Sequence, residues 1–107
     1  MVATQREVVY EVDAPKARGR YRRSEPPPPY TYAVTLEVEE EEGVWTTVRL
    51  WDNADDVNEH HVHEYTRRDG KQTPLIRHFE SINEAMAVAN AECGEKAAEI
   101  VRQWWES

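Results

Sequence analysis

Three of the four histidines of the chain stand together in the sequence His60-His61-Val62-His63. Side chains alternate between the two faces of a β-strand, so on a strand His61 and His63 share one face. Two neighbouring imidazoles can hold one divalent metal ion at about 2.0–2.1 Å from each nitrogen. Imidazole also titrates near neutral pH, which suits it to accept or donate a proton in catalysis. The spacing therefore favours either metal binding or acid–base chemistry at this pair.

Carboxylates just before the histidines can assist either chemistry. They are Asp52, Asp55, Asp56 and Glu59. One of them can complete a metal site of two histidines and a carboxylate, or it can fix the tautomer of a catalytic histidine. Glu64 follows the pair too closely and faces the other side of the strand, so the pattern is not a full metal signature. We therefore assign no metal ligand and no cofactor, and a divalent metal ion stays an open alternative.

The charge of the chain is unevenly distributed along the sequence. Residues 1–29 carry six basic and four acidic groups, residues 30–107 carry seven basic and seventeen acidic groups, and the net charge of the whole chain is −8. The acidic part repels a phosphate backbone at long range, so contact with RNA has to be local. The candidate nucleic-acid-binding residues are Arg20, Arg22, Arg23, Arg67, Arg68 and Lys71.

The elements that must position these residues are strands for most of the chain. Alternating apolar and polar residues predict strands within residues 1–12, 30–39, 44–51, 61–66 and 73–79. Residues 13–29 contain five of the six prolines and a basic cluster, which predicts a flexible arm or a long loop. Gly43 and the pair Asp69-Gly70 mark the turns of two hairpins.

A helix is predicted at the C-terminal end. Ser81 and Glu84 form a capping box, which marks a helix start. One apolar stripe follows, made of Ile82, Met86, Ala89, Cys93, Ala97, Ile100 and Trp104. Gly94 within it favours a kink or a break. The prediction is an α+β fold, with an antiparallel sheet of four to five strands and a long C-terminal helix packed on one face. Residues 30–107 form the α+β domain of a single-domain chain.

A helix on one face of the sheet leaves the opposite face to be explained. We expect that face to carry Trp45, Trp51 and one of the pair Trp104 and Trp105. Tryptophan is unfavourable in contact with water, so the pattern predicts a homodimer through this Trp-bearing face. The chain has one cysteine, no apolar run near 18 residues and no apolar N-terminal segment, which predicts a cytoplasmic protein without a membrane partner.

The segment Val-Arg-Leu-Trp-Asp-Asn-Ala at residues 48–54, followed by the His61-Val62-His63 motif, resembles the TumE family of toxins from toxin–antitoxin systems. The resemblance spans roughly residues 30–105. It implies a prokaryotic protein with an antitoxin partner and a target in RNA or translation. It also implies that one site is lined by Asp52, Asn53, His61 and His63, which we take as candidate catalytic residues.

Three functions therefore stay open. The first is a toxin-like protein that acts on RNA, with ribonuclease-like activity that uses the histidine pair for acid–base chemistry. The second is a non-enzymatic interaction domain that dimerises through its tryptophans. The third is a small metal-binding protein.

Overall fold

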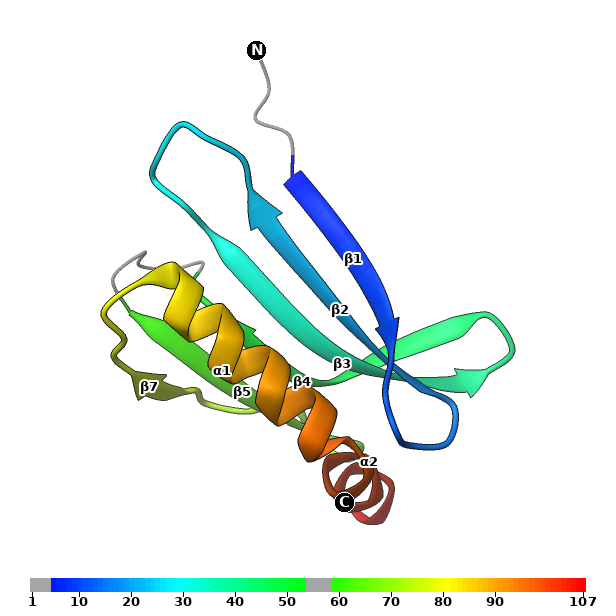
Figure 1. The fold of residues 1–107 in the computed structure, drawn as a ribbon. Coiled ribbons are helices and arrows are strands. Elements are labelled where there is room, and N and C mark those ends of the chain that lie inside the picture. Colours follow the sequence, from blue (N-terminus) through cyan, green and yellow to red (C-terminus); the bar gives the residue numbers. More distant parts are fainter. Residues whose placement is uncertain (1–4, 54–58) are drawn as a thin grey trace.

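The computed structural model describes residues 5–53 and 59–107. They form an α+β fold in which a curled antiparallel sheet of seven strands precedes two helices (Figure 1). The strands are β1 (Gln5–Glu11), β2 (Ala17–Ser24), β3 (Tyr32–Glu41), β4 (Val44–Asp52), β5 (His60–Thr66), β6 (Gly70–Lys71) and β7 (Leu75–Arg77). Strands β1 to β6 lie in chain order, and β7 also pairs with β5. The predicted α+β class is confirmed, but the sheet has more strands than the four or five predicted.

Residues 17–24 form strand β2, so the prediction of an arm or loop over residues 13–29 is wrong for this segment. β2 pairs antiparallel with β1 and with β3. Its buried residue is Gly19, which lies opposite Tyr10 of β1. A Cβ atom at Gly19 would lie 2.3 Å from the Tyr10 ring, so the tyrosine fills the place of the missing side chain. Because the buried position is a glycine, β2 shows no apolar alternation.

Strand β4 contains a β-bulge that reverses its side-chain alternation. The register shifts between Leu36 and Glu37 of β3, which leaves Val48 as an extra residue in β4. An extra residue turns the following side chains to the opposite face. Val48 and Trp51 therefore both enter the core. The predicted grouping of Trp51 with Trp45 on the face away from the helix is wrong for this reason.

The C-terminal segment forms two helices, α1 (Ile82–Glu95) and α2 (Ala97–Glu106), where one long helix is predicted. α1 starts as predicted, because the Ser81 hydroxyl accepts a hydrogen bond of 3.1 Å from the backbone N–H of Glu84. The break at Lys96 follows Gly94, the residue that weakens the helix. α1 packs on β2 and β3, and α2 packs on β4 and β5. In the described part of the chain, neither helix is long and apolar enough to cross a membrane.

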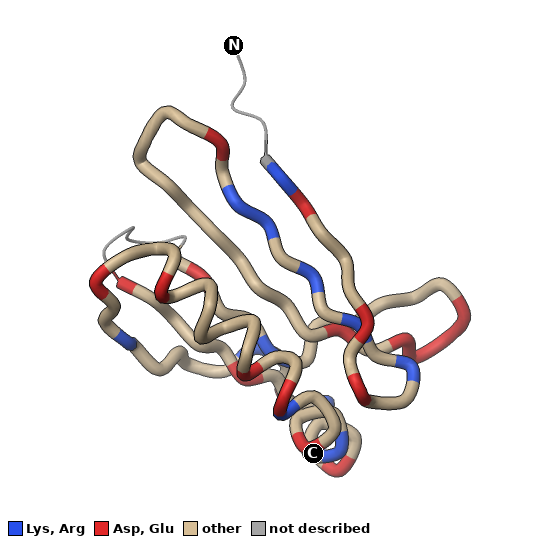
Figure 2. Tube along the Cα trace, viewed as in Figure 1, with Lys and Arg blue, Asp and Glu red and all other residues tan. Residues whose placement is uncertain are grey.

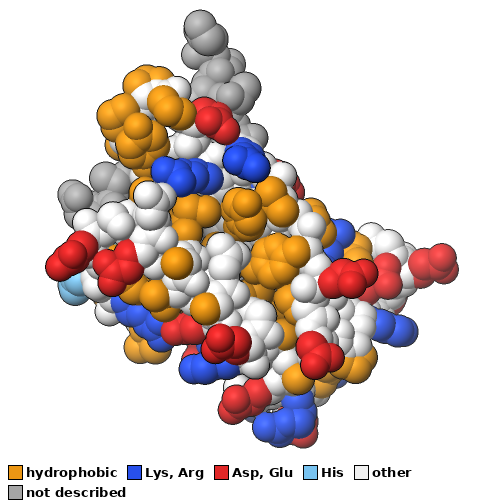
Figure 3. Space-filling model, in the orientation of Figure 1, with side chains coloured by type: hydrophobic (Ala, Val, Ile, Leu, Met, Phe, Trp, Pro, Cys, Tyr) orange, Lys and Arg blue, Asp and Glu red, His pale blue; other side chains and the backbone are white. Residues whose placement is uncertain are grey.

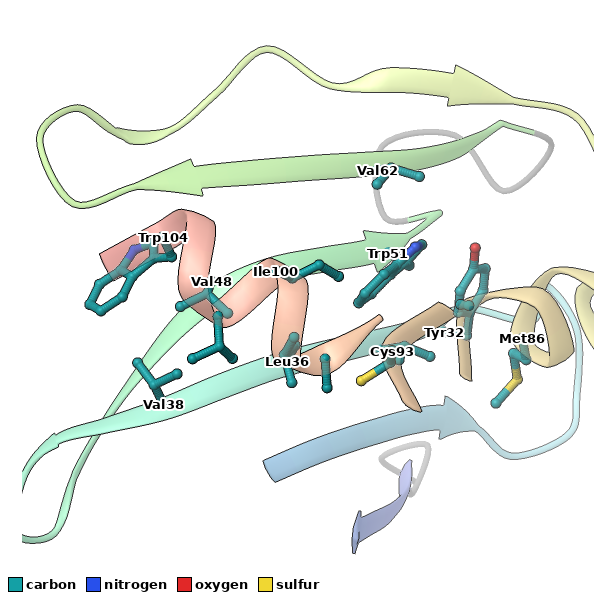
Figure 4. Packing of buried hydrophobic residues seen from close by; sticks show 14 of the residues in the cluster. Tyr32, Leu36, Val38, Val48, Trp51, Val62, Met86, Cys93, Ile100 and Trp104 are labelled. Atoms are coloured by element: carbon teal, nitrogen blue, oxygen red, sulfur yellow. The ribbon is translucent and has the colours of Figure 1, made fainter. Parts of the chain in front are cut away.

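Apolar side chains of the sheet and both helices meet in one core (Figure 4). The helix stripe is confirmed, since Met86, Ala89, Cys93, Ala97, Ile100 and Trp104 are all buried. Trp51 and Trp104 lie in this core, so they do not form the exposed face that we expect to mediate dimerisation. Trp105 is 40% exposed, and Trp45 is half-buried under the Arg18 guanidinium, which lies 3.9 Å from its ring centroid. Two of the four tryptophans, Trp51 and Trp104, are thus core residues.

The sheet face away from the helices carries polar and charged side chains, some of which are buried. Glu37 is only 4% exposed, and its carboxylate pairs with Arg18 at 2.9 Å and with Arg20 at 3.1 Å. A buried carboxylate needs such partners to compensate for lost hydration. Figure 2 shows the basic residues of β2 along the sheet and the acidic residues gathered at the β3–β4 turn.

Candidate metal centre

Strands β4 and β5 bring Asp52, His61 and His63 to one place on the face away from the helices. In the antiparallel register, Asp52 is directly opposite His61 and Leu50 is opposite His63. Their neighbour Trp51 points into the core, so strand alternation directs all three polar side chains to the other face. The alternation of His61 and His63 is as predicted, and the β4–β5 pairing supplies the carboxylate.

The three side chains form one compact group of ligand atoms. One carboxylate oxygen of Asp52 and one ring nitrogen from each histidine all lie within 4.8 Å of one another. The residues are buried, with exposed fractions of 8% for Asp52, 4% for His61 and 6% for His63. A buried group of this composition, two imidazoles and one carboxylate, matches the ligand preferences of divalent transition metals.

The distance between His61 and Asp52 is close to that of two ligands on one ion. Nδ1 of His61 lies 3.7 Å from Oδ1 of Asp52, which is too long for a hydrogen bond. Two ligands at about 2.0–2.2 Å from a tetrahedral ion are separated by roughly 3.3–3.6 Å. Nδ1 of His61 is buried and has no hydrogen-bond partner in the described part of the chain. An ion between His61 and Asp52 would satisfy this orphaned nitrogen.

Each histidine has a further partner on the ring nitrogen that would not bind the ion. Nε2 of His61 lies 3.4 Å from Oε2 of Glu59, and Nδ1 of His63 lies 3.4 Å from the backbone oxygen of Gln72. A carboxylate or carbonyl only accepts, so a ring proton on either of these nitrogens would face an acceptor. The lone pair is then left on Nδ1 of His61 and on Nε2 of His63. Metal-binding histidines usually have such an outer partner.

Asn53 lies apart from this group and holds the backbone. Its Oδ1 accepts a hydrogen bond of 2.9 Å from the N–H of Tyr32, and its Nδ2 donates one of 3.1 Å to the carbonyl of Tyr30. Asn53 is 1% exposed, so it joins the β2–β3 connection to the end of β4 inside the protein. These contacts give the asparagine a structural task.

His60 also lies outside the group, because it faces the helix side of β5. Nδ1 of His60 lies 3.1 Å from the Tyr32 hydroxyl, and its ring packs edge-on against Phe79 at 5.1 Å between centroids. Burial lowers the pKa of His60, and the nearby charges of His61 and His78 act in the same direction. Burial likewise raises the pKa of Tyr32, so both partners stay uncharged at neutral pH.

The candidate nucleic-acid-binding residues do not gather around the histidines. Arg20 pairs with Glu7 and Glu37 on β1 and β3. The remaining candidates have other surroundings: Arg23 donates to Asn83, Arg67 lies over the rings of Trp104 and Trp105, and Arg22, Arg68 and Lys71 are exposed. Of the carboxylates named from the sequence, Asp55 and Asp56 lie outside the described residues.

The backbone carbonyl of Gln72 is the member of the site that the sequence does not indicate. It reaches His63 because residues 72–74 connect β6 to β7, which pair with the same strand. A backbone carbonyl is present at every residue, so the contact of the Gln72 carbonyl with His63 depends on the strand pairing alone.

The chain matches no family model, no curated protein and no solved structure.

Proposed function

We propose that the protein binds one divalent transition-metal ion through Asp52, His61 and His63. The observation that carries the proposal is the buried Nδ1 of His61, which has no hydrogen-bond partner among residues 5–53 and 59–107 and lies 3.7 Å from the Asp52 carboxylate. A buried polar atom without a partner is costly, by about 1–3 kcal/mol, and an ion at this place removes the cost. The outer contacts of both histidines, to Glu59 and to Gln72, point to the same use.

Zinc is the ion that suits this ligand set best. Zn²⁺ takes nitrogen and carboxylate ligands in a tetrahedron, and three protein ligands leave one position for water. Mg²⁺ and Ca²⁺ prefer sites made mainly of oxygen, so the two imidazoles select against them. Nickel and copper accept the same atoms but favour other geometries. We therefore expect zinc to bind more tightly than magnesium or calcium by several orders of magnitude.

Action on RNA by the same histidines, as in a TumE-like toxin, stays a prediction with less support. His61 and His63 are buried, so a polynucleotide has little access to their rings. Arg20 is paired with carboxylates and does not reach the pair. Proton transfer to a substrate needs a heavy-atom distance of about 2.6–3.2 Å or one intervening water. The metal-binding alternative requires no such access.

The direct test is metal binding by the purified protein after removal of metal with a chelator. Wild type should bind one equivalent of zinc in a calorimetric titration and retain one zinc in elemental analysis after gel filtration. His61→Ala, His63→Ala and Asp52→Asn should each weaken zinc binding by about tenfold or more. His78→Ala is the matched control, because His78 is exposed and lies outside the group. Equal zinc binding by wild type and His61→Ala would exclude this site.

The RNA prediction is tested with the same set of proteins. Labelled total RNA is incubated with wild type, with His61→Ala/His63→Ala and with wild type plus chelator. Under our proposal, RNA cleavage is absent in all three samples while zinc binding is intact in wild type. Cleavage by wild type that disappears in the double variant and persists with chelator would instead support metal-free acid–base catalysis.

A further inference from the structure

Two adjoining cavities lie on the protein away from the candidate metal centre, where the β2–β3 connection meets the start of α1. The first has a volume of about 260 Å³ and the second about 220 Å³. Tyr30 lines both of them, so it is the residue that they have in common. Figure 3 shows the apolar surface of the proline-rich connection next to basic side chains at this end of the sheet.

The first cavity is lined by rings and apolar groups together with two polar residues, Glu80 and Ser81. Tyr30, Phe79 and Pro29 contribute flat apolar surfaces, and His60 contributes an imidazole held by Tyr32 and Phe79. Pockets for drug-sized ligands have volumes of roughly 300–1,000 Å³, so this cavity suits something smaller. A planar heterocycle of one or two rings fits both its size and its aromatic lining, because rings stack favourably on aromatic side chains.

The second cavity is lined by groups that suit an anion of low charge. Arg6 and Arg23 contribute two guanidinium groups, and Glu25 contributes one carboxylate, so the formal balance is one positive charge. Arg6 has no acidic partner among the described residues. The Arg23 guanidinium lies 5.8 Å from the Tyr30 ring centroid and donates to Asn83. A phosphodiester carries one negative charge and matches this balance better than a phosphomonoester, which carries nearly two.

We propose that the two cavities together bind one nucleotide of a single-stranded nucleic acid. The base stacks on Tyr30 in the first cavity, and the phosphodiester lies between Arg6 and Arg23 in the second. Stacking of an unpaired base on an aromatic side chain, with an arginine at the adjacent phosphate, is a general mode of single-strand recognition. The site is local, so it is compatible with the net charge of −8 of the chain. It does not depend on the metal proposal, since none of its residues is a ligand.

The test measures fluorescence anisotropy of labelled eight-nucleotide strands, one of RNA and one of DNA, with the chelator-treated protein. Wild type should bind at least one of them saturably. Tyr30→Ala should weaken binding by about 5- to 150-fold, because stacking contributes about 1–3 kcal/mol per base. Arg23→Gln should weaken it by about tenfold. Binding should fall only slightly with salt, with a slope near −0.7 for one neutralised phosphate.

Arg102→Gln is the matched control, since it removes one exposed guanidinium on α2, outside both cavities. It should bind like wild type. If Arg102→Gln weakened binding as much as Arg23→Gln, the effect would come from the overall charge of the protein and the proposal would be overturned. Unchanged binding in Tyr30→Ala, or no binding of either strand, would overturn it as well. AMP and inorganic phosphate are the further arms, and AMP binding as tight as strand binding would assign the site to a free nucleotide instead.

Discussion

At the scale of single residues, neighbours in the sequence perform separate tasks because strand alternation separates their side chains. Asp52 and Asn53 are adjacent, yet the aspartate faces the histidine pair and the asparagine holds the backbone of Tyr30 and Tyr32. His60 and His61 are separated in the same way, with one ring on each face of β5. A motif of consecutive polar residues therefore does not define one site.

Replacement of Asn53 tests its structural task. Asn53→Ala leaves the N–H of Tyr32 and the carbonyl of Tyr30 without their partner, which should destabilise the protein by about 1–3 kcal/mol. The free energy of unfolding in urea is the measurement. Asn83→Ala is the control, because Asn83 is exposed and accepts a hydrogen bond from the partly exposed Arg23, and it should change stability by less than about 0.5 kcal/mol. An Asn53→Ala protein as stable as wild type would contradict this structural role.

Glu92 predicts a pH dependence of stability. Burial acts to raise its pKa, but hydrogen bonds from Arg77 and Trp51, with the charges of Arg77 and Lys96, outweigh this and hold the pKa below its ordinary value. A lowered pKa in the folded state contributes stability above the unfolded pKa of about 4.3, and this contribution is lost as the pH falls through the folded pKa. Glu92→Gln should therefore be less stable than wild type at pH 7, and the difference should shrink below pH 4.

The measurement for Glu92 is the urea midpoint of both proteins between pH 3 and pH 7. At pH 7 the expected loss is about 1 kcal/mol, since Arg77 is partly exposed and solvent screens its charge. Glu95→Gln, an exposed substitution on the same helix, is the control and should change little at any pH. A difference between wild type and Glu92→Gln that stays constant with pH would show that the charge of Glu92 is not involved.

At the scale of elements, the contact between Gly19 and Tyr10 joins β2 to β1 and to a helix. The Tyr10 ring crosses Gly19, and its hydroxyl donates a hydrogen bond of 2.8 Å to Asn90 of α1. Aromatic rings often cover a glycine in a neighbouring strand. The absence of a side chain at residue 19 is thus a requirement for the packing of the N-terminal hairpin on α1.

Gly19→Ala should destabilise the protein by about 1–3 kcal/mol, because the added Cβ displaces the Tyr10 ring and breaks its bond to Asn90. Gly94→Ala is the opposite case, since no atom lies within 4 Å of its added Cβ and the residue is helical. It should stabilise the protein by up to about 1 kcal/mol. Thermal unfolding measures both, and a neutral Gly19→Ala would show that Tyr10 can move aside freely.

The elements that sequence reasoning identifies are those with a clear apolar period. The alternation in β3 and the stripe from Met86 to Trp104 both predict the core side chains correctly. The sequence pattern does not predict β2, where a glycine is the buried residue, or the side-chain directions after Val48, where one extra residue inverts the alternation. Both features depend on a partner strand, so a single-strand pattern does not contain them.

The candidate site likewise contains features that the sequence predicts and features that depend on the pairing of strands. Strand alternation is enough to place His61 and His63 together, but the pairing of β4 with β5 decides that Asp52 is their carboxylate. The contact of His63 with the carbonyl of Gln72 depends on how the chain returns to β5 after β6. The sequence motif therefore places two of the three candidate ligands together, whereas the third ligand and the surroundings of the site depend on the tertiary fold.

At the scale of the whole molecule, the proposed ion would link β4, which carries Asp52, to β5, which carries His61 and His63. Zinc at a hundredfold excess over its dissociation constant should stabilise the folded state by about 2.7 kcal/mol. For a domain of this size, that raises the midpoint of thermal unfolding by roughly 10–20 °C. The scan is made with zinc and with chelator, for wild type and for His63→Ala. Equal shifts in both proteins would place the stabilising ion elsewhere.

Strand order in this sheet has a consequence for how the chain folds. Strands β1 to β6 pair in the order in which they occur in the chain, so each pairing needs only a short loop to close. Such local pairing favours rapid formation of the sheet. The helices come last, and they cover the face that carries Leu36, Trp51 and Val62. During synthesis on the ribosome, the sheet therefore exposes this face until the two helices emerge, and that interval is when the nascent protein is most exposed to aggregation.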